Sequence, residues 1–208
     1  MPQLESKYSA GAAVGFWQRI KEVDMFFAGT DDVHDSLRRI VGRLDQAGIP
    51  YAVVGGMAVN AHNYHRTTKD VDLLLSAQGF TAFRQLFVSD LDPIQGRIRQ
   101  FRDRVNQVKI DVLVTGMFPG SGKPGPIAYP DPASVSERMQ NVSVVNLATL
   151  VEMKLAARRY RDFGDVVELI RFNNLDEAFA DRLHLSVRGD YIECLEEMRR
   201  DDEYDERN

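Results

Sequence analysis

The segment 51–75 constrains the fold of this chain more than any other part of the sequence. A short apolar run at 51–54 stops at a glycine pair, and a stretch of helical composition follows it. A polar loop then leads to Asp-Val-Asp at 70–72, where only the two acids interrupt a second apolar run. Short β-branched runs bounded by glycine predict strands, and the stretch between them predicts a helix. The segment therefore predicts a strand–helix–strand unit with two acids on its second strand.

Similar patterns extend this unit along the chain. Helical spacing of apolar residues predicts a helix at about 31–47, and another is predicted at 78–86. Strands are predicted at 97–102 and 107–114, and a long stretch rich in Gly, Pro and Ser predicts a loop. The sequence thus divides into an N-terminal helical extension (1–30), an α/β core (31–115), a Gly/Pro-rich loop (116–141), a helical part (142–200) and an acidic tail (201–208).

The composition excludes several classes of protein. The chain has 208 residues and one cysteine, Cys194, so a disulfide framework is excluded and a reducing cytoplasm fits. No apolar run reaches the roughly 18–20 residues of a membrane-spanning helix, and the N-terminus lacks the pattern of a signal peptide. The net charge is −5, of which the tail 201–208 carries −4, so the rest shows no global basic field for nucleic acid. We expect a cytoplasmic protein with no membrane partner and a disordered acidic tail.

The glycines and acids are arranged for phosphate chemistry. Gly55 and Gly56 allow the backbone to approach a ligand closely, and they open a helix whose free N–H groups favour phosphate. Asp70 and Asp72 are two residues apart on a strand, so both carboxylates face one side, with Cα atoms ~6.5–7 Å apart. Such acids repel each other unless a cation lies between them, and Mg²⁺ prefers a few carboxylates plus substrate phosphates. Asp111, within a later apolar strand, is the candidate third carboxylate of a two-metal site for in-line displacement at phosphorus.

These features together resemble the signature of a known superfamily. The pattern is similar to the signature of nucleotidyltransferases of the DNA polymerase β type. It consists of a small-residue pair, thirteen intervening residues and then Asp-Val-Asp-Leu at 70–73. The third acid of that superfamily lies on a separate strand, as Asp111 is predicted to do. Residues 147–168 resemble the helical block of abortive-infection type nucleotidyltransferases, so that the resemblance covers roughly 50–170. The matching positions in this block are Lys154, Arg158, Arg161, Asp162 and Asp165.

The resemblance implies a fold and an activity. The fold would be of the α/β (α+β) class, a mixed sheet flanked by helices with a C-terminal helical part that completes the active-site cleft. The activity would be transfer of a nucleoside monophosphate from a nucleoside triphosphate to a hydroxyl acceptor, with Mg²⁺ or Mn²⁺ as cofactor and pyrophosphate released. The acceptor would be an RNA or tRNA end, a protein side chain or a small hydroxyl compound. The abortive-infection likeness implies a toxin of a toxin–antitoxin pair, with an antitoxin protein as partner.

The resemblance also assigns roles to individual residues. Asp70, Asp72 and Asp111 would be the catalytic metal ligands, and Asp111 would help to activate the attacking hydroxyl. The backbone at Gly55 and Gly56 would hold the nucleotide. Further nucleotide-binding candidates are Arg66, Thr68, Lys154 and Arg158, with Asp162 and Asp165 as secondary candidates.

One departure from the superfamily pattern keeps a second function open. Active members more often carry Gly-Ser, whereas this chain has Gly56 at the second position and lacks that hydroxyl. The alternative is a catalytically weak or inactive module that binds a nucleotide or a protein partner on the same fold. A phosphatase or sugar transferase using Asp-x-Asp is disfavoured, because a polar loop precedes the pair and a glycine–helix element lies nearby. His62 and His65, without cysteines, do not predict a structural zinc site.

Overall fold

A seven-stranded mixed sheet forms the centre of the chain in a computed structural model that describes residue 21 and residues 25–207. Its strands are β1 (Tyr51–Val53), β2 (Asp70–Leu75), β3 (Leu91–Ile94), β4 (Arg97–Asp103), β5 (Lys109–Val114), β6 (Ser136–Met139) and β7 (Val142–Val145). They lie in the order β3-β4-β5-β2-β1-β7-β6. β2 runs parallel to β5 and β1 parallel to β7, while the other neighbours are antiparallel. The predicted mixed α/β class is confirmed.

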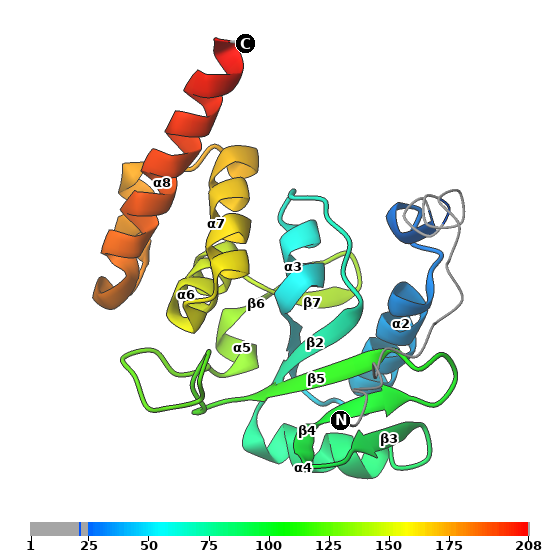
Figure 1. The fold of residues 1–208 in the computed structure, drawn as a ribbon. Helices are drawn as coiled ribbons and strands as arrows, with labels where there is room; N and C mark the ends of the chain where they lie inside the picture. Colours follow the sequence, from blue (N-terminus) through cyan, green and yellow to red (C-terminus); the bar gives the residue numbers. More distant parts are fainter. Residues whose placement is uncertain (1–20, 22–24, 208) are drawn as a thin grey trace, which may run out of the picture.

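Helices lie on both faces of this sheet. They are α2 (Asp32–Gln46), α3 (Gly55–Ala61), α4 (Ala77–Leu86), α5 (Pro132–Val135), α6 (Leu147–Ala157), α7 (Tyr160–Asn173), the 3₁₀ helix η1 (Glu177–Arg182) and α8 (Leu185–Glu206). α2 and α4 cover one face, where Phe83 of α4 packs on Phe101 of β4 and Ser36 of α2 donates to Asp103 of β4. α6, α7 and α8 are grouped beside α3, away from α4 (Figure 1).

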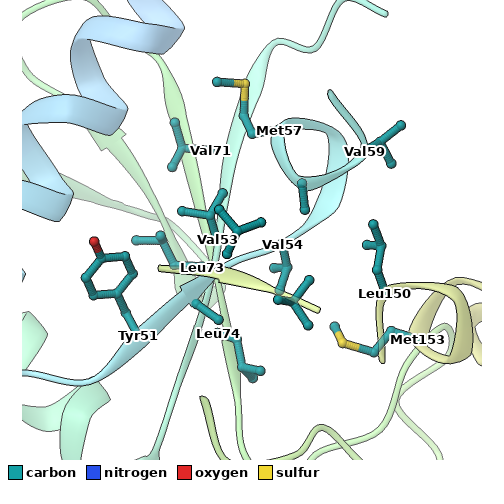
Figure 2. Packing of buried hydrophobic residues seen from close by; sticks show 14 of the residues in the cluster. Tyr51, Val53, Val54, Met57, Val59, Val71, Leu73, Leu74, Leu150 and Met153 are labelled. Carbon is teal, nitrogen blue, oxygen red and sulfur yellow. The ribbon is translucent and has the colours of Figure 1, made fainter. Parts of the chain in front are cut away.

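The core is built from strands that are apolar on both faces. Leu73, Leu74 and Leu75 of β2 are fully buried, as a central strand covered on both sides requires. Figure 2 shows buried side chains of β1, β2 and α3 close together, with Leu150 and Met153 of α6 on the same side as α3. The acids of β2 are therefore confined to its first half, before this fully buried run begins.

The predicted loop 116–141 was wrong in its last third. Asp131 caps the short helix α5, which has Pro132 in its first turn, and β6 and β7 then form a hairpin beside β1. Residues 142–145, predicted as the start of the helical part, are strand β7, as their β-branched valines favour. The segment 116–131 contains turns and neither helix nor strand. The sheet is therefore wider than the sequence predicted, and its added hairpin leads directly into α6.

Other differences are local. β3 was missed because Asp92 and Pro93 form strands poorly, although proline is tolerated on an edge strand such as this one. The acidic tail is helical rather than disordered, since α8 continues to Glu206. The predicted extension 1–30 lies almost wholly outside the described residues. Within the part of the chain that the structure describes, every helix is too short or too polar to cross a membrane.

Candidate active site

Two parallel strands bring the predicted acids together. In the register of β2 and β5, Asp72 lies directly opposite Asp111, and Asp70 lies opposite Lys109. Because side chains alternate along a strand, all four project from the same face of the sheet. Asp72 and Asp111 line a cavity that residues of α6 also line. The structure thus places the three acids on one face and adds Lys109, which the sequence pattern had not singled out.

The backbone of Gly55 lies directly against the Asp72 carboxylate. Gly55 has a φ of +63°, in the left-handed region, and a Cβ at this position would lie 1.9 Å from Asp72 Oδ2. The N–H of Val54 donates to the carbonyl oxygen of Asp72 at 3.0 Å. Only glycine has both the conformational freedom and the small volume that position 55 requires. The position of the Asp72 carboxylate therefore requires glycine at position 55.

Burial and neighbouring acids change the ionisation of Asp72. Burial raises the pKa of Asp72 to about 6, and the charges of Asp111 and Asp70 add to this rise. The charges of Lys109 and Lys154 act in the opposite direction. A carboxylate with a raised pKa is one whose negative charge is poorly compensated, so an additional cation would stabilise it.

The two oxygens of Asp111 have different surroundings. Oδ2 accepts a hydrogen bond from Lys109 Nζ at 2.5 Å. Oδ1 is buried and has no hydrogen-bond partner among the described residues. Buried polar atoms in proteins are nearly always paired, so this exception calls for a missing partner. On a side chain that lines a cavity, the unpaired oxygen is a candidate ligand for a cation.

A cavity of about 560 Å³ adjoins these acids, within the size range of small-molecule sites. Asp72 and Asp111 line it from the sheet, and Lys154 of α6 lines it from the helical part. Asp70 is not part of the lining, since its side chain lies at the start of β2 and is 41% exposed. Cationic and aromatic side chains that also line the cavity are Arg97, Arg99, Phe118, Tyr129 and Arg159.

The packing around position 56 explains why this position is a glycine. A Cβ at position 56 would lie 2.7 Å from Thr68 Oγ1, 2.8 Å from Thr68 Cβ and 3.3 Å from Arg66 Nη1. The buried Thr68 side chain therefore occupies the space that a serine at position 56 would need. Thr68 and Arg66, both predicted nucleotide contacts, lie beside the start of α3. The absence of a serine hydroxyl at position 56 is thus accompanied by a threonine hydroxyl next to the same backbone.

Lys154 belongs to an ion-pair network between α6 and α7. Its Nζ donates to Asp165 Oδ2 at 2.6 Å and to Asp162 Oδ1 at 3.2 Å. Arg66 holds Asp165 through two hydrogen bonds of 2.6 and 2.8 Å, and Arg159 donates to Asp162 at 2.5 Å. Burial acts to raise the pKa of Asp165, but the hydrogen bonds and charges of Arg66 and Lys154 lower it below its ordinary value. The acids of this network are therefore well compensated.

The structure does not bring Arg158 to the cavity. Arg158 follows the end of α6 in a left-handed conformation, with φ 54°, and its guanidinium donates to Asp190 Oδ2 of α8 at 2.9 Å. The neighbouring Arg159 lines the cavity instead. α6 ends at Ala157, and the turn at Arg158 changes the direction of the chain. Because of this left-handed turn, the Arg158 side chain pairs with Asp190 and does not line the cavity.

The three acids share a face without converging on one point. Among residues 21 and 25–207, no three His, Cys, Asp or Glu side chains form a group placed to hold a metal ion. Lys109 lies between two of the acids, with Nζ 2.5 Å from Asp111 Oδ2 and 3.8 Å from Asp70 Oδ2. The donor set nevertheless suits a hard divalent cation, because carboxylate oxygens are its preferred ligands and Asp111 Oδ1 is unpaired.

Three residues at the site, Lys109, Arg99 and Tyr129, are not among those predicted from the sequence. Lys109 could have been found from the sequence, because it stands two residues before Asp111 and must share its face. Arg99 reaches the cavity from β4, and Tyr129 reaches it from the segment 116–131. No local pattern indicates these last two positions, since only tertiary packing brings them to the acids.

No family model and no curated protein matches the sequence. Solved structures are similar at low identity. A candidate nucleotidyltransferase of Thermotoga maritima, TM1012, is 13% identical, with a TM-score of 0.43 over 67% of this chain and 89% of that one. JHP933 of Helicobacter pylori is 13% identical, with a TM-score of 0.44 over 73% of this chain and 71% of that one.

A third solved structure, ANT(2'')-Ia in complex with adenylyl-2''-tobramycin, is 11% identical, with a TM-score of 0.41 over 79% of this chain and 93% of that one. Two of the structures that this chain resembles are described as candidate nucleotidyltransferases. At these identities and TM-scores the likenesses carry no conclusion about activity. The finer likeness to abortive-infection enzymes stays a prediction.

Proposed function

We propose that this protein transfers a nucleoside monophosphate from a nucleoside triphosphate to a hydroxyl acceptor, with Mg²⁺ or Mn²⁺ as cofactor and pyrophosphate as the second product. The observation that supports this most directly is the register of β2 and β5, which sets Asp72 opposite Asp111 beside a cavity of about 560 Å³. The backbone of Gly55 lies against Asp72 and lines the same cavity. Paired acids next to a cavity suit a substrate that carries phosphate groups.

The residues present fit a divalent cation. Asp72 and Asp111, which line the cavity, would hold it, with Asp111 Oδ1 as the oxygen that lacks a partner among the described residues. Asp70 would add negative charge at the start of β2. When bound, the cation would neutralise charge on the phosphates and make the phosphorus more susceptible to attack. Without it, the Lys109 ammonium compensates part of the negative charge through its hydrogen bond to Asp111.

We assign triphosphate binding to the residues around the start of α3. The backbone N–H groups of Gly55 and Gly56 would donate to phosphate oxygens, and the Thr68 hydroxyl beside Gly56 would supply a further hydrogen bond. Arg66 is held by Asp165 in a bidentate pair, so it would position the loop that carries Thr68. From the helical part, Lys154 and Arg159 line the cavity and would contact the phosphates, with Asp162 and Asp165 orienting them. Arg158 takes no part in this proposal.

We assign the acceptor to the opposite side of the acids. An in-line displacement sets the attacking and leaving oxygens on opposite sides of phosphorus. In the sheet order, β1, which leads into α3, and β4 flank the β5-β2 pair on opposite sides. The acceptor hydroxyl would therefore enter from the side of β4, close to Asp111, which would help to activate it. An RNA or tRNA end, a protein side chain or a small hydroxyl compound would fill this role. A cytoplasmic toxin paired with an antitoxin is the finer form of the same proposal.

A labelling panel tests the proposal. Each α-labelled nucleoside triphosphate is incubated with the protein, Mg²⁺ or Mn²⁺, total cellular RNA and lysate. We expect label in one acceptor class with the wild-type protein and none with the Asp70→Ala, Asp72→Ala double variant. Asp92→Asn is the matched control, because Asp92 is an exposed acid on β3 that pairs with Arg104. A double variant as active as the wild-type protein contradicts the proposal.

A second candidate function is nucleotide binding without turnover. The observation that favours it is Lys109, whose ammonium already occupies the side of Asp111 that faces Asp70. Tight Mg²⁺-dependent binding of ATP, with no pyrophosphate released across the whole acceptor panel, would favour this candidate over transfer.

A further inference from the structure

Lys109 carries a positive charge into the group of acids on β2 and β5. Its Nζ lies 2.5 Å from Asp111 Oδ2 and 3.8 Å from Asp70 Oδ2. The sheet fixes this position, because Lys109 is opposite Asp70 in the strand register and two residues before Asp111. All three side chains therefore leave the same face. The Lys109 side chain is 28% exposed, so its charge is only partly solvated and its interactions with these acids are strengthened.

The lysine is held as an ammonium in these surroundings. Its Nζ donates to Asp111 and lies near Asp70, so two carboxylates accompany the positive charge. An ammonium and a divalent cation repel each other at short range, and partial exclusion of water increases the repulsion. The two cations therefore compete for the oxygens that face Lys109.

The carboxylate oxygens divide into two sets. Asp111 Oδ2 and Asp70 Oδ2 face the ammonium of Lys109. Asp111 Oδ1 has no hydrogen-bond partner among the described residues, and Asp72 lies against Gly55 at the cavity. The cavity side thus offers two carboxylates, which is the number of protein ligands that one Mg²⁺ commonly takes together with substrate phosphates and water.

We propose that Lys109 takes the place of one of two divalent cations, so that each chain binds a single divalent cation, held by Asp72 and Asp111 Oδ1. Lys109 is then a positioning residue, because it holds Asp111 Oδ2 and leaves Oδ1 without a hydrogen-bond partner among the described residues. The inference rests on the proposed function, since it concerns the cation that this function requires.

The number of Mn²⁺ ions bound per chain tests the inference directly. Mn²⁺ is titrated into the full chain with a non-hydrolysable ATP analogue, and free Mn²⁺ is measured by electron paramagnetic resonance against the analogue alone. We expect one ion per chain in the wild-type protein and two in Lys109→Met, which lacks the competing ammonium. Lys109→Arg keeps the charge and should bind one. Lys69→Met is the matched control, because it removes an exposed lysine next to β2.

The outcomes separate the inference from the proposed function. Two ions in the wild-type protein, or one ion in both the wild-type protein and Lys109→Met, overturn the inference and leave the function standing. No bound Mn²⁺ in any of these proteins contradicts the metal-dependent function itself. Mn²⁺ should also raise the Tm of Lys109→Met more than that of the wild-type protein, because the variant leaves the acids uncompensated. The wild-type count is decisive even where Lys109→Met fails to fold.

Discussion

Two groups of charged side chains border the same cavity, and they differ in how completely their charges are compensated. Between α6 and α7, Lys154 and Arg66 both hold Asp165 and lower its pKa. On the sheet, the pKa of Asp72 is raised to about 6, and Asp111 keeps one buried oxygen without a partner among the described residues. The charges between α6 and α7 are therefore compensated within the folded chain, whereas the charges of the acids on β2 and β5 are only partly compensated.

The difference separates stability from function. A buried charge with its partners in place contributes to the folded state, and removing one partner is costly because the other charge is left buried. A poorly compensated acid destabilises the folded chain until a ligand supplies the opposite charge. The network between α6 and α7 thus has the character of a structural element, and the acids of β2 and β5 have the character of a binding site.

Asp72→Asn should have the largest effect. We expect the rate of nucleotidyl transfer to fall by about three orders of magnitude, because removal of a metal-binding carboxylate abolishes most of the charge stabilisation at phosphorus. The free energy of unfolding should stay constant or rise, since asparagine removes a charge repelled by Asp111 and Asp70. Pyrophosphate release and urea unfolding measure the two effects, with Asp92→Asn as control. A fall in both the transfer rate and the free energy of unfolding would show that Asp72 has a structural role like that of Asp165.

Asp165→Ala should act mainly on stability. We expect the free energy of unfolding to fall by about 3–5 kcal/mol, because Lys154, whose side chain is 7% exposed, loses its closest partner. Denaturant unfolding measures this loss. Glu177→Ala is the control, since its exposed pair with Arg199 should be worth about 0–1 kcal/mol. An unchanged stability with lost activity would move Asp165 from the structural network into the site.

Gly56→Ser tests the packing next to the site. The added side chain would collide with Thr68, so we expect a loss of about 1–3 kcal/mol in the free energy of unfolding and no gain in transfer rate. Combining it with Thr68→Ala should recover part of the stability. Gly42→Ser in α2 is the control, because no atom lies within 4 Å of a Cβ there. A more active and equally stable Gly56→Ser would show that the missing serine limits this protein.

The pH dependence of stability should show the smallest effect. In the folded chain the pKa of Asp72 is raised from 3.8 to about 6, so the folded state binds a proton in this interval that the unfolded state does not. Lowering the pH from about 7 to about 5 without metal should therefore stabilise the chain by about 1 kcal/mol, and Asp72→Asn should lose this gain. Asp165 does not interfere, because its lowered pKa matters only below its ordinary value of 3.8. Urea unfolding at the two pH values, with chelator present, measures the difference.

The acids could be predicted because local rules determine where they point. The alternation of side chains along a strand sets Asp70 and Asp72 on one face, and the apolar run of β5 marks Asp111 as an exception within it. The parallel pairing that sets Asp72 opposite Asp111 could not be read from the same patterns, because strand order depends on the whole chain. The resemblance to a known superfamily predicts only that Asp111 lies on a separate strand, and the pairing is a finding of the structure.

The remaining errors have identifiable causes. The resemblance of residues 147–168 predicts Arg158 as a nucleotide contact, but it does not reveal the left-handed turn that ends α6 and directs Arg159 to the cavity. The hairpin of β6 and β7 spans the predicted boundary between the loop and the helical part, so neither prediction included it. Lys109 was overlooked because a lysine among apolar residues suggests a solvent-exposed position, although its register with Asp70 places it among the acids.

The continuity between β7 and α6 determines how a substrate can be selected. β7 pairs in parallel with β1, and Asn146 alone separates it from α6, which it caps by accepting a hydrogen bond from the N–H of Thr149 at 2.9 Å (Figure 1). The helix that carries Lys154 is thus an extension of the sheet that carries Asp72. A change in the separation of Lys154 and Asp72 would therefore have to act through β7 and its pairing with β1, so nucleotide selection is linked to the integrity of the sheet.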